Sequence, residues 1–246
     1  MQLNTKSIKS RFEKSMDKYD DNAIVQHNMA KNIVGELLKI SNKFESILEL
    51  GSGTGILTKE ILKSINFEHY TANDLVEKSK NYITKIIPNA KFIHGNSLKI
   101  NTNEHFDLII SNAMFQWFSN LDEILVKCKR QLKKNGILAF STFGTENFQE
   151  IKELSGLGLK YLSTVEIKNI LLQENFEIEL IIEYKKTLEF KNPLELLAHM
   201  KNTGVNSLSA KPWTVKDIKE FCEKYLEKYN TVKLTYNPII VIAKAK

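Results

Sequence analysis

The sequence predicts an α/β fold with a mostly parallel sheet and helices on both faces. Two observations carry this prediction. Short apolar segments with strand character alternate with segments whose apolar residues recur at helical spacing. This alternation is typical of βαβ units, whose strands are apolar throughout because helices cover both faces of the sheet. A glycine-rich loop also follows the first strand and precedes a helix.

The first five strands are expected at residues 46–50, 67–72, 90–94, 106–111 and 137–142. Beyond residue 143 the pattern predicts a helix at 165–173, one long strand at 176–190, a short helix opened by Asn192-Pro193 and a final strand at 232–243. Thr214 is expected to cap another helix. The inward face of that helix is expected to consist of Val215, Ile218, Phe221, Cys222, Tyr225 and Leu226. We expect one domain over 1–246, with an N-terminal cap at about 1–28 and a lid insertion at about 191–213.

Composition indicates an ordinary globular protein. Of the 246 residues, 42% are hydrophobic and 26% charged, and the net charge is +6. Only Arg11 and Arg130 among the 35 cationic residues are arginines, and the lysines spread over predicted helices. This pattern favours solvated helix surfaces over a reader of nucleic-acid bases, where arginine's planar fork matters. We therefore expect no nucleic-acid partner.

Several classes of site and location are disfavoured. Cys128 and Cys222 lie far apart on the apolar faces of predicted helices, which suits a reducing compartment. The N-terminus has no apolar signal-peptide core, and no apolar run is long enough to span a membrane. The five histidines show no ligand spacing, so no metal is expected. We expect a cytoplasmic monomer that does not bind membranes.

The glycine loop, in the segment I-L-E-L-G-S-G-T-G at 47–55, is the most informative stretch. Glycines let a backbone adopt positive φ and pass close to a ligand. The dinucleotide fingerprint G-x-G-x-x-G does not fit, because the third glycine comes one residue early and Ile56 occupies its place. A phosphate-binding P-loop does not fit either, because no lysine follows. Glu49, two residues before the first glycine, is a further difference from both.

Polar residues are expected at the ends of the next strands, where ligands of open α/β sheets bind. Asp74 follows the second strand, and a carboxylate there can accept ribose hydroxyls of either a dinucleotide or another nucleoside cofactor. Gly95-Asn96-Ser97 follows the third strand, and S-N-A-M-F-Q-W-F at 111–118 closes the fourth.

The pattern E-x-G-x-G-x-G resembles motif I of class I S-adenosylmethionine (SAM) dependent methyltransferases. The resemblance implies a Rossmann-like fold with a mostly parallel seven-stranded sheet, an antiparallel last strand and a small helical lid insertion. It also implies that the loop holds the methionine part of SAM and that Glu49 helps to fix its amino group. Asn96 departs from the acid usual in the family, although its amide can still bond adenine. The implied cofactor-binding residues are Glu49, Gly51, Ser52, Gly53, Gly55, Asp74, Leu75, Asn96, Ser97, Asn112, Ala113 and Gln116.

Nearly the whole chain resembles the malonyl-[acyl-carrier protein] O-methyltransferase family of biotin synthesis. The likeness is carried by R-F…Y-D…A…Q at 11–26, S-N-A-M-F-Q-W-F-S-N-L at 111–121, F-S-T-F-G with N-F-x-E at 140–150, and H-M-K-x-T-G-x-N at 199–206. It implies methylation of the free carboxylate of a malonyl thioester, with S-adenosylhomocysteine as co-product. The implied partner is an acyl-carrier protein, an acidic protein whose charge suits the net charge of +6.

This chemistry asks little of side chains. A carboxylate is already ionised at neutral pH and needs no base, so positioning and exclusion of water would suffice. A cation should orient the carboxylate, provided that the salt bridge does not quench the nucleophile. The candidates for positioning are Tyr19, Lys160 and Lys201, and those for substrate binding are Tyr19, Gln26, Phe115, Trp117, His199 and Lys201. Helix packing for Tyr19 and Gln26, core filling for Phe115 and plain solvation for the lysines remain alternatives.

Other functions stay open at this point. Another SAM methyltransferase acting on a small carboxylic acid or a quinone precursor is the first alternative, and dependence on a carrier protein would discriminate it. An NAD-dependent oxidoreductase is disfavoured by the early third glycine and by Glu49. A nucleic-acid methyltransferase would carry a proline-containing clamp after the fourth strand, where this chain has N-A-M-F. A SAM-binding protein without activity is the last alternative.

Overall fold

The structure, a computed structural model, describes residues 5–204 and 213–246. Its strands are β1 (Lys43–Leu50), β2 (Asn66–Asp74), β3 (Lys91–His94), β4 (Phe106–Ser111), β5 (Leu132–Phe143), β6 (Phe176–Glu183), β7 (Lys186–Glu189), β8 (Lys233–Tyr236) and β9 (Pro238–Ala245). Its helices are α1 (Thr5–Asn22), α2 (Ile24–Leu37), α3 (Ile56–Ser64), α4 (Ser79–Ile86), the 3-10 helix η1 (Phe115–Trp117), α5 (Leu121–Gln131), α6 (Gln149–Ser155), α7 (Thr164–Gln173), α8 (Pro193–Asn202) and α9 (Val215–Lys228).

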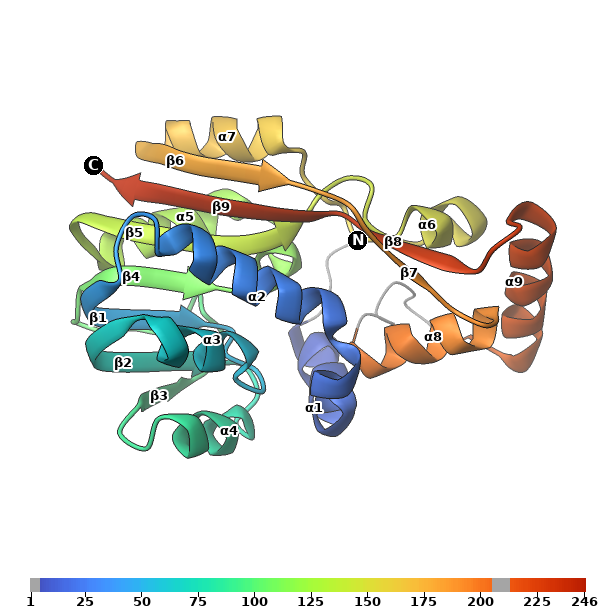
Figure 1. The fold of residues 1–246 in the computed structure, drawn as a ribbon, viewed down its shortest axis with the longest axis horizontal. Helices are drawn as coiled ribbons and strands as arrows, with labels where there is room; N and C mark the ends of the chain where they lie inside the picture. Colours follow the sequence, from blue (N-terminus) through green and yellow to red (C-terminus); the bar gives the residue numbers. More distant parts are fainter. Residues whose placement is uncertain (1–4, 205–212) are drawn as a thin grey trace.

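Within the described ranges, the main sheet has seven strands in the order β3-β2-β1-β4-β5-β9-β6 (Figure 1). Strands β1 to β5 pair in parallel, whereas β9 runs antiparallel to both β5 and β6. The predicted mostly parallel sheet with an antiparallel last strand is therefore confirmed. The strand order reverses at β1 and β4, and such a switch point is where open α/β sheets bind ligands.

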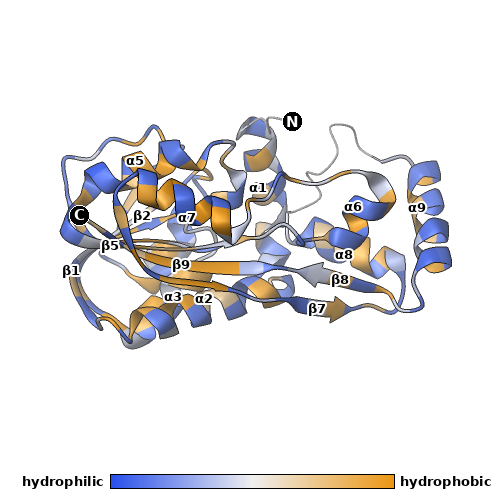
Figure 2. Cartoon of the chain, turned by 90° about the horizontal axis from the view of Figure 1, so that it is seen from above, coloured by the Kyte–Doolittle hydropathy of each residue, from blue (hydrophilic) through white to orange (hydrophobic). Residues whose placement is uncertain are grey.

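Helices cover both faces of the sheet, as predicted. Neighbouring residues of one strand point to opposite faces, so Ile47 packs with α2, α3 and α4 while Leu48 packs with α5 and α7. Strand β9 shows why such strands look apolar throughout. It is largely hydrophobic (Figure 2), and seven of its eight residues are buried. The two buried clusters fix the sheet and, with it, the positions of the loops at the strand ends.

The structure corrects two predicted strands. The single strand expected at 176–190 is two strands, because β6 pairs with β9 in the main sheet while β7 pairs with β8 in a second, two-stranded sheet. The single strand expected at 232–243 is likewise divided into β8 and β9, at Asn237. Both junctions are short, Tyr184-Lys185 in the first case and Asn237 in the second, and strand-forming residues resume directly after each, so each pair of strands was predicted as one.

The second sheet belongs to an additional unit beyond the main sheet, with α6, α8 and α9 around it (Figures 1 and 2). Its buried core joins residues of these elements, including Ile151, Met200, Phe221 and Tyr236. The proposed lid at about 191–213 contains α8, and its residues 205–212 lie outside the described residues. Residues 1–4 of the proposed N-terminal cap also lie outside them.

The cap of α9 agrees with the sequence, but the face of the helix does not. Thr214 accepts a hydrogen bond from the Asp217 backbone, and the Asp217 carboxylate accepts bonds from Thr214 in return. Val215 and Leu226, expected to face inward, are 85% and 60% exposed. The buried face is narrower than predicted because α9 lies at the end of the molecule, where α6, α8 and β8 contact one side of it.

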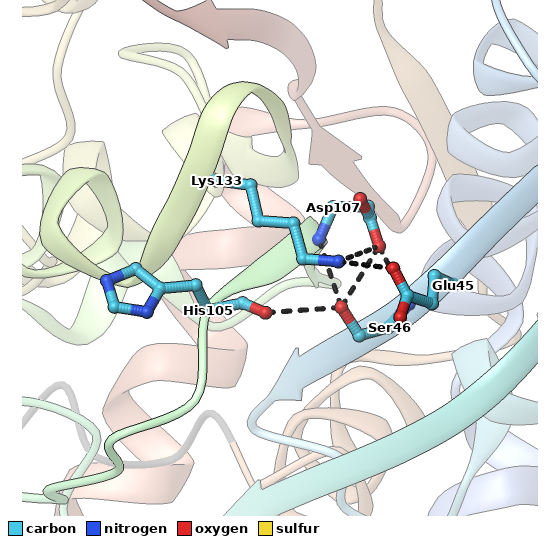
Figure 3. Close-up of polar contacts among 5 residues, drawn as sticks. All are labelled: Glu45, Ser46, His105, Asp107 and Lys133. Atoms are coloured by element: carbon cyan, nitrogen blue, oxygen red, sulfur yellow. Dashed lines mark hydrogen bonds and ion pairs between the residues drawn. The ribbon is translucent and has the colours of Figure 1, made fainter.

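A polar cluster holds the amino ends of β1, β4 and β5 together (Figure 3). Lys133 Nζ lies 2.7 Å from a Glu45 carboxylate oxygen and 3.1 Å from one of Asp107. Asp107 also accepts bonds from the backbone N–H and hydroxyl of Ser46. Partial burial opposes ionisation, but these bonds outweigh it and lower the pKa of Asp107. The cluster lies at the amino ends of the parallel strands, so its role is structural.

No helix in the described part of the chain is both long and apolar enough to cross a membrane. Both cysteines are free, and Cys128 is buried in the core as its apolar position predicted.

Candidate active site

A cavity of about 830 Å³ lies at the carboxyl ends of the central strands. The arrowheads of β1 and β4 point toward α1 and the additional unit (Figure 1). The cavity wall combines the loops after β1, β2, β3 and β4 with residues of α1 and of the loop between α6 and α7. Its volume is within the range of about 300–1,000 Å³ typical of small-molecule sites.

The glycine loop lines the cavity in a conformation that favours glycine. Gly51 and Gly53 have φ angles of +70° and +53°, in the left-handed region. A Cβ atom on Gly51 would lie 2.6 Å from Cγ of Met114, so a side chain there is excluded by space as well. The backbone N–H groups of Gly51 and Ser52 donate to the carbonyl of Asn73, which ties the loop to the end of β2.

Gly55, by contrast, does not line the cavity within the described residues. It has a φ of +83° and stands at the start of α3, where a Cβ atom would lie 2.4 Å from Cδ1 of Ile86. The geometry therefore gives Gly55 a packing role between α3 and α4. Spacing alone did not separate this glycine from the two before it.

We expect Gly55→Ala to destabilise the fold by roughly 1–3 kcal/mol, through backbone strain and contact with Ile86. Ile86→Val removes the contacting methyl group, so the double variant should be more stable than the two single effects predict. Gly156→Ala is a matched control, because Gly156 has a φ of +67° and open space around it. Urea unfolding measures the free energy of unfolding of all four variants. A loss of ligand affinity in Gly55→Ala under fully folded conditions would contradict the packing role.

Asp74 joins the end of β2 to the glycine loop. Its carboxylate accepts bonds from the backbone N–H of Gly53 at 2.8 Å and of Val76 at 2.7 Å. Burial raises its pKa, and these two bonds act in the opposite direction. Asn73, which the sequence analysis did not single out, donates to the carbonyls of Ile93 and Gly95, and so fixes the loop after β3. The available signal in the sequence was a polar amide residue directly before Asp74, at the end of a predicted strand.

Glu49 is buried at the end of β1 and lines the cavity. Its carboxylate accepts hydrogen bonds from the hydroxyls of Thr58, at 2.6 Å, and Tyr70. Burial raises the pKa of Glu49 from 4.5 to about 7. The two hydroxyl groups act in the opposite direction, because they stabilise the ionised form, and the nearby Asp74 carboxylate raises the pKa further. At neutral pH this carboxyl group is therefore poised between its two protonation states.

Helix α1 lies across the glycine loop and contributes to the cavity wall. A Cβ atom on Gly53 would lie 3.1 Å from the Phe12 ring, so α1 approaches the loop closely. The Phe12 ring also packs edge-on against the Tyr19 ring, with 5.0 Å between the ring centroids. Asp20 accepts a hydrogen bond from Thr54 and forms an ion pair with Lys59 at 2.9 Å. These contacts were not predicted, because they depend on how α1 packs on the loop.

Three buried polar atoms in the cavity wall have no hydrogen-bond partner among the described residues. They are Gln26 Oε1, Ser52 Oγ and Gln116 Oε1. Buried polar atoms normally have partners, so these atoms are available to a polar ligand. Together with the Asp74 and Glu49 carboxylates, they fit a cofactor that carries hydroxyl, amine and carboxylate groups, as SAM does.

The remaining expected cofactor residues line the same cavity: Leu75, Asn96, Ser97, Asn112 and Ala113. Ser97 donates to the Asn73 side chain, and the Asn96 side chain accepts the backbone N–H of Leu98. Asn112 donates to the Gln26 carbonyl and accepts the Ser141 hydroxyl. The structure thus brings together every expected cofactor residue except Gly55, and their individual roles remain predictions.

The residues expected to bind or to position the substrate divide into two groups. Tyr19, Gln26, Trp117 and Lys160 line the cavity. Burial, with the carboxylates of Asp20 and Asp74 nearby, raises the pKa of Tyr19, which keeps its hydroxyl protonated.

Three expected residues do not line the cavity in the part of the chain that the structure describes. Phe115 is stacked on Phe140 at 4.3 Å in the core, and Lys201 is exposed on α8. His199 is buried behind the wall, with Nε2 2.7 Å from the hydroxyl of Tyr236, which does line the cavity. Burial lowers the pKa of His199 from 6.5 to about 4, so the ring is neutral at neutral pH.

Similarity to known proteins agrees with this geometry. Residues 48–140, from the end of β1 to β5, match the family model described as a methyltransferase domain. The chain is 37% identical to the malonyl-[acyl-carrier protein] O-methyltransferase of Calditerrivibrio nitroreducens, over 97% of this chain and 96% of that protein. It is 33% identical to the enzyme of the same name from Haemophilus influenzae, over 96% and 93% of the two chains. The chain belongs to the malonyl-[acyl-carrier protein] O-methyltransferase family. It is a SAM-dependent methyltransferase by family, as its resemblance predicted.

Solved structures support the fold alone. The N-methyltransferase NodS from Bradyrhizobium japonicum, solved with S-adenosyl-L-homocysteine, is 11% identical with a TM-score of 0.58, over 97% of this chain and 98% of that one. The YcgJ protein from Bacillus subtilis superposes with a TM-score of 0.65 at 12% identity, over 87% and 98%. The class I methyltransferase fold is therefore confirmed, and the NAD-dependent oxidoreductase is not supported.

Proposed function

We propose that this protein transfers a methyl group from SAM to the free carboxylate of malonyl-acyl-carrier protein. The product would be the malonyl methyl ester, an early intermediate on the way to the pimeloyl chain of biotin. The observation that carries the proposal is the similarity to enzymes of this name over nearly the full length of both chains. The additional unit is part of that similarity, and it supplies part of the cavity wall.

SAM would supply an activated methyl group on a positively charged sulfur. The chain would bind it through the glycine loop, Asp74, Glu49 and the loops after β3 and β4. The unpartnered oxygens of Ser52 and Gln116 support this placement. In the described part of the chain no cluster of His, Cys, Asp or Glu is arranged to hold a metal ion, and the proposed chemistry uses none.

The acceptor would occupy the part of the cavity between α1 and the additional unit. Tyr19, Gln26 and Trp117 line it and would exclude water. Lys160 is exposed at the rim, where it could meet the incoming acyl chain. Lys201 and His199 do not line the described cavity wall, so we propose no direct contact between them and the substrate. The reaction consumes no proton and needs no base, so we assign the two carboxyl groups of the cavity wall, Glu49 and Asp74, to SAM binding and not to acid–base catalysis.

An acyl-carrier protein is the proposed partner, and the net charge of +6 supports an encounter with an acidic protein. We also propose a cytoplasmic location, which the two free cysteines support. A monomer remains our expectation.

The substrate is tested by comparing methyl transfer to malonyl-acyl-carrier protein, malonyl-CoA, acetyl-acyl-carrier protein and free small acids. We expect rapid transfer to the carrier-bound malonyl group and none to the acetyl form, which lacks the free carboxylate. Transfer to a free acid or a quinone precursor, with none to the malonyl thioesters, would favour the alternative of a different small-molecule methyltransferase.

A further inference from the structure

Tyr161 brings an unused hydrogen-bond donor to the cavity. It lies in the loop between α6 and α7, and it lines the cavity wall. Its phenol oxygen accepts a hydrogen bond from Asn147 Nδ2 at 2.8 Å. Within the described residues this is the only hydrogen bond of Tyr161, so its own O–H is not committed to a protein acceptor. Burial raises the pKa of Tyr161, so the phenol stays protonated at neutral pH.

The direction of that bond is fixed by a third residue. Asn147 is buried, and its Oδ1 accepts the backbone N–H of Asn237 at 3.1 Å. Only the oxygen of the Asn147 side-chain amide can accept a backbone N–H, so the NH₂ group of this amide faces Tyr161 and donates to it. The phenol oxygen is therefore the acceptor in this pair, and the phenol hydrogen has to find its partner elsewhere. The cavity is the side from which a ligand can reach it.

No buried cation of the described cavity wall lies beside Tyr161. Among the described residues of the cavity wall the cations are Lys9 and Lys160. Lys9 lies near His94 at the end of the edge strand β3, with 3.5 Å between their nitrogens, whereas Asn147 and Asn237 adjoin β5 and β9 on the other side of β1. Lys160 is exposed. The interior near Tyr161 instead holds Tyr236, whose pKa is raised by burial and by the nearby phenols of Tyr19 and Tyr161.

We propose that Tyr161 orients the acceptor by donating its O–H to the free carboxylate, and that Asn147 is the positioning residue that directs this O–H. The proposal rests on the proposed function and names the group that recognises the carboxylate. It replaces the cation expected from the sequence with a neutral donor held in a buried amide network.

A neutral donor suits the charge change of this reaction. A bond forms between a carboxylate oxygen and the methyl carbon, and the bond between that carbon and sulfur breaks, with its electron pair remaining on sulfur. A negative and a positive charge are thereby cancelled, and no proton moves. A cation paired with the carboxylate would stabilise the charged reactants more than the less charged transition state, and so would slow the step. A phenol O–H positions the oxygen with a smaller penalty of this kind.

The test measures recognition of the carboxylate apart from turnover. With enzyme saturated by S-adenosylhomocysteine, the affinities for malonyl- and acetyl-acyl-carrier protein are compared in wild type, Tyr161→Phe and Asn147→Ala. We expect the preference for the malonyl form to fall by about 10- to 100-fold in Tyr161→Phe, as for the loss of a hydrogen bond to a charged group. Affinity for the acetyl form and for SAM should stay within about twofold of wild type. Asn147→Ala should show a smaller loss of the same preference.

Two controls separate the possible failures. Tyr229→Phe removes a phenol O–H that bonds Glu153 on the surface, and it should leave the preference unchanged. Lys160→Gln tests the competing cation. A preference that survives in Tyr161→Phe and is lost in Lys160→Gln would overturn the inference while leaving the proposed function intact. A wild-type enzyme that neither prefers nor methylates the malonyl form would overturn the proposed function itself.

Discussion

Replacing Asp74 with alanine is expected to weaken SAM binding by at least about 100-fold, which corresponds to roughly 3 kcal/mol. The carboxylate holds the glycine loop through the N–H of Gly53 and the following loop through the N–H of Val76. Each hydrogen bond to a charged group contributes about 1.5–3 kcal/mol. In the proposed complex the same carboxylate also accepts the ribose hydroxyls, so both the site and the contact are lost. Isothermal titration calorimetry measures the affinity directly.

Asp74→Asn provides the matched control, because it keeps the shape of the side chain and one acceptor oxygen. Its affinity should lie between those of wild type and Asp74→Ala. Circular dichroism verifies that both variants fold. If Asp74→Ala is folded and binds SAM within about threefold of wild type, the cavity is not the cofactor site that we assign.

SAM affinity is expected to depend on pH through Glu49, whose pKa burial raises to about 7. The proposed partner is the ammonium group of SAM, which prefers the ionised carboxylate. Below about pH 7 binding must therefore release a proton, and affinity should fall by nearly tenfold per pH unit. Above about pH 7 the affinity should become independent of pH, until the α-amino group of SAM loses its own proton near pH 8, the ordinary range of such groups. Calorimetry between about pH 5.5 and 7.5 covers the relevant range, in which an α-amino group stays mostly protonated.

The stability of the ligand-free protein should show the opposite trend. The pKa of Glu49 is higher in the folded protein than its ordinary value of 4.5, so the neutral form favours folding. Its stabilising contribution is complete below pH 4.5 and is lost as the pH rises to about 7. Glu49→Gln should remove both trends and bind SAM more weakly at neutral pH. An affinity that is flat across this range in wild type would show that the Glu49 carboxylate is not what SAM binds.

The sequence predicted the parts of the fold that depend on local pattern. The apolar strands β1 to β5, the glycine loop and Asp74 at the end of β2 each carry a signal within a few residues. The junction at Tyr184-Lys185 contains no glycine or proline, and Asn237-Pro238, although a dipeptide typical of turns, does not tell that the chain changes sheets, because that is decided by the partner strands. Residues that line the cavity from the four strand-end loops were predicted well for the same reason.

Residues that depend on packing between distant segments were not predicted. The pairs Asp20–Thr54 and Asn147–Tyr161 join elements whose approach cannot be deduced from spacing. Lys201 and His199 were expected at the site from the resemblance of a short stretch, but a helix presents only one face to a cavity. In α8, His199 is buried and forms a hydrogen bond with the hydroxyl of Tyr236, whereas Lys201 is exposed to solvent. That no buried cation lies beside Tyr161 in the described part of the cavity wall likewise became visible only when that wall was assembled.

The most direct test of the account is methyl transfer from SAM labelled in the methyl group to malonyl-acyl-carrier protein, with the unloaded carrier and Asp74→Ala as controls. The account predicts label on the malonyl carrier alone, released by mild base as expected of a methyl ester, and lost in the Asp74→Ala variant. Label that resists base, or that reaches the unloaded carrier equally well, would contradict methylation of the malonyl carboxylate.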